Sequence, residues 1–216
     1  MQADMQIRFL CLNLWHSKFL NEIIAFIKKE HPDILALQEV FDGTDASWEA
    51  KYRTRDILRQ ELGYPYEYFS ASFLECLPFG KVPEGNLILS KFPIQTEKTM
   101  FFDIPFGERL EDTLENAPFT PRSFQHVSLL AEGKTLNIFN TQGVWGLDGG
   151  DNERRIAMGK TIADNVKDQP NTILAGDFNV NPNTRTINQI EEHLTNVFKG
   201  ELISTFNMKH KSHPGF

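Results

Sequence analysis

The sequence predicts an α/β protein in which mixed β-sheets are covered by helices. Strand-like and helix-like patterns alternate along the 216 residues, without repeats, low-complexity tracts or a Gly/Ser-rich linker. Short continuous apolar runs are typical of strands buried on both faces, and other strands are separated only by a tight turn. Because hairpins and helical crossovers occur together, mixed sheets are favoured over a purely parallel sheet, in one domain spanning residues 1–216.

The N-terminal part of the chain alternates strands and helices. Residues 7–14 form a β-rich apolar run, and residues 33–40 form a short apolar run typical of a strand covered on both faces. Between them, Ser17 is predicted to cap a helix whose apolar residues repeat at helical spacing until Pro32 ends it. A second helix is predicted over residues 47–62, where a glycine closes it.

The remaining elements include a hairpin and two further helices. Strands are predicted over residues 66–73, 86–90, 94–102, 122–131, 135–141 and 172–175. The strands over residues 122–131 and 135–141 are joined by a short turn and form the hairpin. Residues 103–120 are predicted to be a long acidic loop, and helices are predicted over residues 153–166 and 184–193.

Composition and charge exclude several classes of function. The 22 Lys and Arg residues against 29 Asp and Glu residues give a net charge of −7, which excludes a nucleic-acid binder that works through bulk positive charge. No apolar run approaches the roughly 20 residues that span a bilayer, so no transmembrane segment is expected. Cys11 and Cys76 are too few for a disulfide framework, and the first residues, MQADMQIRFL, do not show a basic region followed by a long apolar run, so no signal sequence is expected. A cytoplasmic, monomeric protein is therefore expected.

Polar side chains follow apolar strands at three places in the sequence. Asn13 ends the first strand, Glu39 ends the strand over residues 33–40, and Asp177 and Asn179 follow the strand over residues 172–175. Carboxylates and carboxamides are hard oxygen donors, which suit Mg²⁺ or Mn²⁺. Each residue alone also fits a turn or a surface ion pair. Their recurrence at three strand ends favours a common site.

Five phrases of the sequence together resemble the endonuclease/exonuclease/phosphatase superfamily. In chain order they are LNLW (12–15), LQEV (37–40), GNLILSKFPI (85–94), NTQG (140–143) and GDFN (176–179). This superfamily includes apurinic-site endonucleases, deoxyribonucleases, deadenylases, neutral sphingomyelinases and inositol-phosphate phosphatases. The resemblance runs from about residue 6 to the C-terminus. It implies a four-layer α/β sandwich, with two mixed β-sheets face to face, helices outside, and an active site at one edge.

The resemblance also implies roles for individual residues. Glu39 matches the principal Mg²⁺ ligand, and Asn13 matches the asparagine that supports the metal site. Asp177 and Asn179 match the pair that orients the attacking water and holds the phosphate. The implied activity is Mg²⁺- or Mn²⁺-dependent hydrolysis of a phosphodiester or phosphomonoester, with nucleic acid among the possible substrates and with Asp177 as the residue that deprotonates water.

The sequence departs from the family pattern at two places. Gln142 stands where the family has a histidine that meets the scissile phosphate, and a neutral donor bonds more weakly than a charged one. Family members also continue into a strand that opens with an Asp-His pair, so we expect a C-terminally truncated domain. Arg122, at the start of a strand, is similar in placement to a residue that reaches toward substrate, although an arginine at a sheet edge explains it equally well.

Two classes of function therefore stay open. The first is a hydrolase of phosphoester bonds, and the second is a catalytically lapsed member that binds a phosphate ligand or a protein partner. The candidate catalytic residues are Asp177, Asn179, Gln142 and Asn13, the candidate substrate-binding residues are Arg122 and Asn179, and the candidate metal-binding residues are Glu39 and Asn13. His16 is interpreted as a surface histidine at the start of a helix, and Arg154 and Arg155 are interpreted as an exposed helix face.

Overall fold

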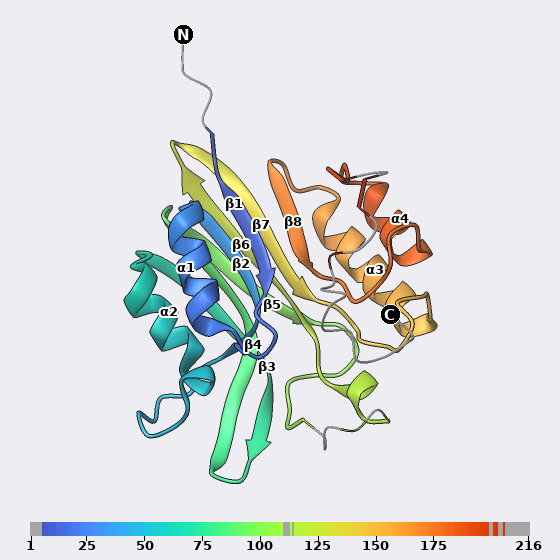
Figure 1. Ribbon diagram of the computed structural model, residues 1–216. Helices are drawn as coiled ribbons and strands as arrows, with labels where there is room; N and C mark the ends of the chain where they lie inside the picture. Colours follow the sequence, from blue (N-terminus) through green and yellow to red (C-terminus); the bar gives the residue numbers. More distant parts are fainter. Residues whose placement is uncertain (1–5, 110–112, 114, 199–200, 203–204, 206–216) are drawn as a thin grey trace.

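The computed structural model describes residues 6–109, 113, 115–198, 201–202 and 205 (Figure 1). Within these residues, eight strands form two four-stranded sheets with the orders β1-β2-β4-β3 and β5-β6-β7-β8. The elements in chain order are β1 (Phe9–Asn13), α1 (Leu20–Glu30), β2 (Ile34–Phe41), the 3₁₀ turn Ala50–Arg53, α2 (Thr54–Leu62), β3 (Tyr66–Leu77), β4 (Gly80–Ser90), β5 (Ile94–Phe101), the 3₁₀ turn Ala117–Phe119, β6 (Ser123–Ala131), β7 (Lys134–Gln142), α3 (Glu153–Val166), β8 (Thr172–Asp177) and α4 (Arg185–Glu191).

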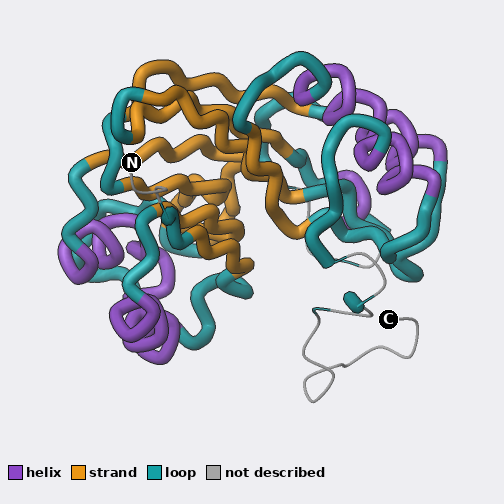
Figure 2. Tube along the Cα trace, turned by 90° about the horizontal axis from the view of Figure 1, so that it is seen from above, coloured by secondary structure: helices purple, strands orange, loops and turns teal. Residues whose placement is uncertain are grey.

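The two sheets pack face to face, and helices cover their outer faces. α1 and α2 lie on the first sheet and α3 and α4 lie beside the second, with the strands between the two groups of helices (Figure 2). β1 is parallel to β2 and β7 is parallel to β8, whereas the other neighbouring strands are antiparallel. Each parallel pair is joined by a helical crossover, as parallel pairing requires. The predicted α/β sandwich with two mixed sheets is confirmed.

The strand β2 shows why the layers hold together. Its alternate residues point to opposite sides of the first sheet, so Leu35 and Leu37 pack under α1 and α2 while Ile34 packs against the second sheet. Both faces are buried, as its continuous apolar run predicts. A separate apolar cluster, which includes Phe139 and Met158, joins the second sheet to α3.

The interface between the sheets changes from apolar to polar along the strands. At one end, apolar side chains meet, including Ile34, Ile88, Val127, Leu129 and Ile138. Toward the other end, buried amides replace them. Gln38 donates to Oδ1 of Asn140 over 2.6 Å, and Asn140 donates to Oε1 of Gln125 over 3.0 Å. Because buried amides need partners, this network fixes how the sheets align just below the end that carries the predicted site.

The first two helices begin later than predicted. Ser17 does not cap α1; the residue before the helix is Phe19, and no described side chain caps it. The Ser17 hydroxyl instead accepts a hydrogen bond of 2.6 Å from Thr54 Oγ1, which ties the start of α1 to the start of α2. The predicted helix over residues 47–62 is a 3₁₀ turn followed by α2, because Asp45 accepts hydrogen bonds from Ser47 and holds that segment in a turn.

The hairpin of β3 and β4 is longer than the two separate strands that were predicted. β4 begins at Gly80 rather than at residue 86, and Pro83 pairs with Leu74 and Gly85 pairs with Ala71 in an antiparallel ladder. The other predicted elements agree within a few residues, although part of the predicted acidic loop, residues 110–112 and 114, lies outside the described residues. Among the helices described, none has the length and apolar character needed to cross a membrane.

Candidate active site

The predicted residues of the two sheets meet at one edge of the sandwich. Asn13, at the end of β1, donates from Nδ2 to Oε1 of Glu39 over 2.9 Å and to Oδ2 of Asp177 over 2.8 Å. Asn13 and Asp177 are 164 residues apart in sequence, and they belong to different sheets. A single carboxamide therefore bridges two carboxylates that would otherwise repel each other, and it joins the sheets at the site.

Glu39 points into the site because β2 is irregular there. The pairing of β2 with β4 shifts register between Leu37 and Val40, and Glu39 adopts a left-handed backbone conformation with φ of 59°. A bulge of this kind re-aims a side chain, and a positive φ is unfavourable for a glutamate. This backbone conformation is specified by tertiary contacts, since Glu39 receives hydrogen bonds from Asn13, His16 and Gln142.

Gln142 lies beside Glu39 at the end of β7. Its Nε2 donates to Oε1 of Glu39 over 2.8 Å, and the residue is 1% exposed. Its Oε1 is buried and accepts no hydrogen bond from the described residues. The donor that was expected to face a phosphate is thus directed at the carboxylate of Glu39.

Asp177 and Asn179 are held by a close approach of β7 and β8. The Asn179 amide N–H donates to Oδ1 of Asp177 over 3.1 Å, and Asn179 Nδ2 donates to the Gly143 carbonyl over 3.0 Å. A Cβ at Gly143 would lie 2.1 Å from the Phe178 carbonyl oxygen, and one at Gly176 would meet the β7 backbone at 2.1 Å. The glycines of the NTQG and GDFN phrases are therefore needed for this approach.

Burial raises the pKa of Asp177, and the charge of Glu39 acts in the same direction. Hydrogen bonds from Asn13 and from the Asn179 amide oppose this shift. Asp177 is consequently a better proton acceptor than an ordinary aspartate, which is the property that a general base needs.

Arg122 places a positive charge among these carboxylates. Burial lowers the pKa of its guanidinium, whereas the carboxylates of Glu39, Glu84 and Asp177 raise it. Its Nε is buried and has no hydrogen-bond partner among the residues that the structure describes. Arg122 therefore adds a buried positive charge to this group of carboxylates.

Two further residues of the site, His16 and Glu84, were not among the predicted ones. Glu84 lies on β4 and its side chain is 1% exposed, with Oε1 at 3.2 Å from Nδ1 of His16. The His16 amide N–H donates to Oε2 of Glu39 over 2.9 Å, and its Nε2 lies 3.5 Å from the same oxygen. A carboxylate directly before the GNLILSKFPI phrase was the available signal for Glu84.

The charges around His16 favour the protonated form of its imidazole. Burial lowers its pKa, but the neighbouring carboxylates of Glu84 and Glu39 outweigh this effect and raise the pKa to about 9. The interpretation of His16 as a surface histidine at the start of a helix is incomplete, because the half-exposed side chain contacts two carboxylates of the site.

Comparison with known proteins agrees with this geometry. The sequence matches the endonuclease/exonuclease/phosphatase family over residues 10–199. The chain belongs to this family. Members of the family hydrolyse phosphoester bonds. No curated protein matched the sequence in a direct comparison.

Solved structures of the endonuclease/exonuclease/phosphatase family share the fold at low sequence identity. A family protein from Leptotrichia buccalis has a TM-score of 0.61 at 18% identity, over 87% of this chain and 74% of that one. One from Beutenbergia cavernae has a TM-score of 0.61 at 19% identity, over 86% of this chain and 52% of that one. A beta toxin from Staphylococcus aureus with bound magnesium ions has a TM-score of 0.54 at 18% identity, over 88% and 70% of the two chains.

The donor set at this edge fits the divalent cation on which the family depends. Glu39, Glu84 and Asp177 supply carboxylate oxygens, and the buried Oε1 atoms of Glu84 and Gln142 accept no hydrogen bond from the described part of the chain. Asn13 Oδ1, in contrast, accepts from the Trp15 amide N–H over 2.8 Å. In this arrangement Asn13 supports the carboxylates through Nδ2, and its direct ligation of a metal stays a prediction.

Arg155 has a structural role behind the site, so its interpretation as part of an exposed helix face is wrong. The residue is 0% exposed. Its Nε donates to the Val144 carbonyl over 3.1 Å, and its Nη1 lies 3.1 Å from Oδ1 of Asp148. It thereby holds the loop that follows Gln142. Arg154, its neighbour, forms an ion pair with Asp103.

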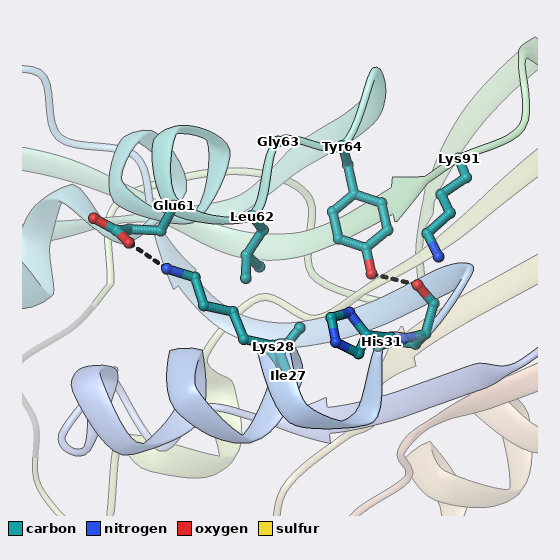
Figure 3. A pocket seen from close by; sticks show the side chains of 9 residues that line it. Ile27, Lys28, His31, Glu61, Leu62, Gly63, Tyr64 and Lys91 are labelled. Carbon is teal, nitrogen blue, oxygen red and sulfur yellow. Dashed lines mark hydrogen bonds and ion pairs between the residues drawn. The ribbon is translucent and has the colours of Figure 1, made fainter.

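A pocket between α1 and α2 is separate from this site. Its lining includes Lys28, Glu61 and Tyr64, and none of the predicted site residues takes part (Figure 3). Tyr64 donates to the Pro32 carbonyl over 2.6 Å, and Lys28 pairs with Glu61 over 2.6 Å. These contacts close α2 against the end of α1, so we interpret the pocket as a feature of helix packing.

Proposed function

We propose that this chain is a divalent-metal-dependent hydrolase of phosphodiester or phosphomonoester bonds. The observation that carries the proposal is the bridge formed by Asn13 between Glu39 and Asp177, which brings together carboxylates from both sheets. Membership of a family of phosphoester hydrolases supports it, and so does the magnesium bound by the structurally similar beta toxin.

Glu39 would hold Mg²⁺ or Mn²⁺, with Asn13 and Gln142 orienting its carboxylate. The bound ion would neutralise charge on a phosphoryl oxygen or on the leaving group. The chain carries a net negative charge, so its surface as a whole would not attract a phosphate. The bound cation and Arg122 would supply the positive charge locally, at the site itself.

Asp177 is the proposed general base. It would take a proton from water, whose oxygen attacks phosphorus as the bond to the leaving oxygen breaks. Hydrogen bonds from Asn13 and from the Asn179 amide hold its two oxygens, so the carboxylate is oriented before the substrate binds. The positive charge of Arg122, which lies near Glu39, Glu84 and Asp177, would attract the phosphate group to this edge of the sandwich.

The test is hydrolysis of an aryl phosphodiester and an aryl phosphomonoester with Mg²⁺ or Mn²⁺. Glu39→Gln is expected to lower the rate by at least about a hundredfold, because the carboxylate charge on the ion is lost. The matched control is Glu61→Gln, which removes an exposed carboxylate on α2 and should leave the rate unchanged. Absence of metal-dependent hydrolysis in the wild type, or an equal rate in Glu39→Gln, would contradict the proposal.

A second candidate function is phosphate binding without turnover. It is favoured by Gln142, since a neutral amide that is already bonded to Glu39 replaces the charged group expected at this position. Metal-dependent binding of inorganic phosphate, measured by calorimetry, without hydrolysis of either aryl ester would support this candidate over the first.

A further inference from the structure

His16 reaches the site through an unusual stretch of backbone. Trp15, His16 and Ser17 have φ values of 46°, 50° and 58°, so three consecutive residues other than glycine are left-handed. The left-handed conformation costs free energy for residues other than glycine, and it persists where contacts with the surrounding structure require it. Here the turn between β1 and α1 directs both the backbone N–H and the imidazole of His16 toward Glu39.

The three side chains of His16, Glu39 and Glu84, called the His16 cluster below, have the spacing of a metal centre. One ligand atom from each lies within 4.8 Å of the other two. Around an ion with ligands at about 2.1 Å, adjacent ligand atoms are about 3 Å apart and opposite ones are about 4.2 Å apart. One ion can therefore contact all three side chains after small movements.

Glu84 is a buried anion that requires a nearby positive charge. Its carboxylate is completely buried, and Oε1 lies 3.2 Å from Nδ1 of His16 but accepts no well-aligned hydrogen bond from the residues described in the structure. A buried carboxylate with an unsatisfied oxygen is destabilising unless a positive charge compensates it. Without an ion, the protonated imidazole of His16 supplies this charge to Glu84 and Glu39. A bound cation would take over that role, and the imidazole would release a proton to solvent as it becomes a ligand.

We propose that the ion held by Glu39 is also ligated by His16 and Glu84, so that the centre prefers Mn²⁺, Co²⁺ or Zn²⁺ to Mg²⁺. Imidazole nitrogen is a good ligand for these transition metals and for zinc, whereas Mg²⁺ takes oxygen ligands and keeps much of its water. This inference rests on the proposed function only in placing an ion at Glu39, and it requires no turnover.

The first test compares the affinities of the metal-free full chain for Mg²⁺, Mn²⁺ and Co²⁺ by calorimetry. The wild type is expected to bind Mn²⁺ and Co²⁺ at least about tenfold more tightly than Mg²⁺. His16→Asn should lose this preference and keep its Mg²⁺ affinity. The matched control is His31→Asn, because His31 is also left-handed, with φ of 48°, and asparagine tolerates that conformation. Unchanged Mn²⁺ and Co²⁺ affinities in His16→Asn would overturn the proposal.

A second measurement can be made on the wild type alone, so its result does not depend on whether a variant folds. Electron spin echo spectroscopy of the Mn²⁺-loaded wild type is expected to detect coupling to a coordinated imidazole nitrogen, which His31→Asn keeps and His16→Asn loses. A wild-type spectrum without nitrogen coupling would overturn the inference, even for a protein that hydrolyses phosphoesters with Mg²⁺. Nitrogen coupling in a protein without hydrolysis would instead refute the proposed function and support this metal centre.

Discussion

The carboxamide of Gln142 donates a hydrogen bond of 2.8 Å from Nε2 to Oε1 of Glu39, between residues 103 positions apart. This bond orients the proposed metal ligand from the opposite sheet. It also occupies the donor that would otherwise be available to a substrate phosphate. We therefore expect Gln142 to be a positioning residue, whose effect on the proposed hydrolysis acts through Glu39.

Gln142→His is expected to raise the rate of phosphoester hydrolysis. A protonated imidazole at this position would donate a charge-assisted hydrogen bond to the substrate phosphate, and such a bond is roughly twice as strong as a neutral one. We therefore expect the transition state to be stabilised by about 1 kcal/mol, which raises kcat about fivefold. Steady-state kinetics on an aryl phosphodiester measure the change. Gln142→Ala is the comparison, and it should lower kcat, because Glu39 then loses a donor. A lower kcat in both variants would show that the amide itself is optimal.

Asn13→Asp is expected to exchange stability for metal affinity. The substitution replaces the donor shared by Glu39 and Asp177 with a third carboxylate, so like charges lie within hydrogen-bonding distance. Without metal, the free energy of unfolding should fall by about 2 kcal/mol, and Mn²⁺ should raise the unfolding temperature more than in the wild type. Urea and thermal unfolding with EDTA or Mn²⁺ provide the measurement.

The control for Asn13→Asp is Asn152→Asp. Asn152 caps α3 by accepting from the Arg155 amide N–H, and aspartate is an equally good cap. This variant should change stability by less than about 0.5 kcal/mol and should not alter the response to Mn²⁺. If Asn13→Asp behaved in the same way, the bridging hydrogen bonds would not hold the site together.

Arg155→Met is expected to be strongly destabilising, although Arg155 lies outside the site. The substitution keeps much of the apolar volume, but it leaves the Val144 carbonyl without its donor and removes the ion pair with Asp148. A loss of about 3 kcal/mol in the free energy of unfolding is expected from urea denaturation. Arg154→Met removes a partly exposed ion pair and should cost less than about 1 kcal/mol. Equal effects of the two substitutions would contradict the buried role of Arg155.

Tyr64→Phe tests the closure of α1 against α2. The hydroxyl donates to the Pro32 carbonyl, so its removal should lower the free energy of unfolding by about 1 kcal/mol at neutral pH. Burial raises the pKa of Tyr64 to about 12, from an ordinary value of 10. The protonated hydroxyl therefore stabilises the fold fully below pH 10 and loses this effect as the pH rises toward 12.

Absorbance at 295 nm follows the ionisation of the tyrosines directly. The wild type should show a late component above pH 11 that Tyr64→Phe lacks, whereas Tyr66→Phe should keep it. A late component that survives in Tyr64→Phe would place the raised pKa on another tyrosine.

Much of the fold and part of the site followed from local patterns. The apolar run of β2 predicted a strand covered on both faces, and hydrophobic spacing predicted α3 with its observed bounds. Patterns failed where a residue's local tendency was overridden. A strand was predicted only over residues 86–90, yet pairing with β3 extends β4 back to Gly80. Serine is a preferred residue type at helix N-caps, but the Ser17 hydroxyl accepts a hydrogen bond from Thr54 of another helix instead.

The α/β class and the candidate residues Asn13, Glu39, Asp177 and Asn179 could be predicted without the structure, because polar groups at the ends of apolar strands are recognisable in the sequence. The positions of His16 and Glu84 beside these residues, in contrast, depend on tertiary contacts. A left-handed turn aims His16 across the site, and the register of β4 against β2 buries Glu84 beside it. Contacts between residues distant in sequence bring these side chains together, and their charges then act on one another, as the proposed metal binding and proton transfer require.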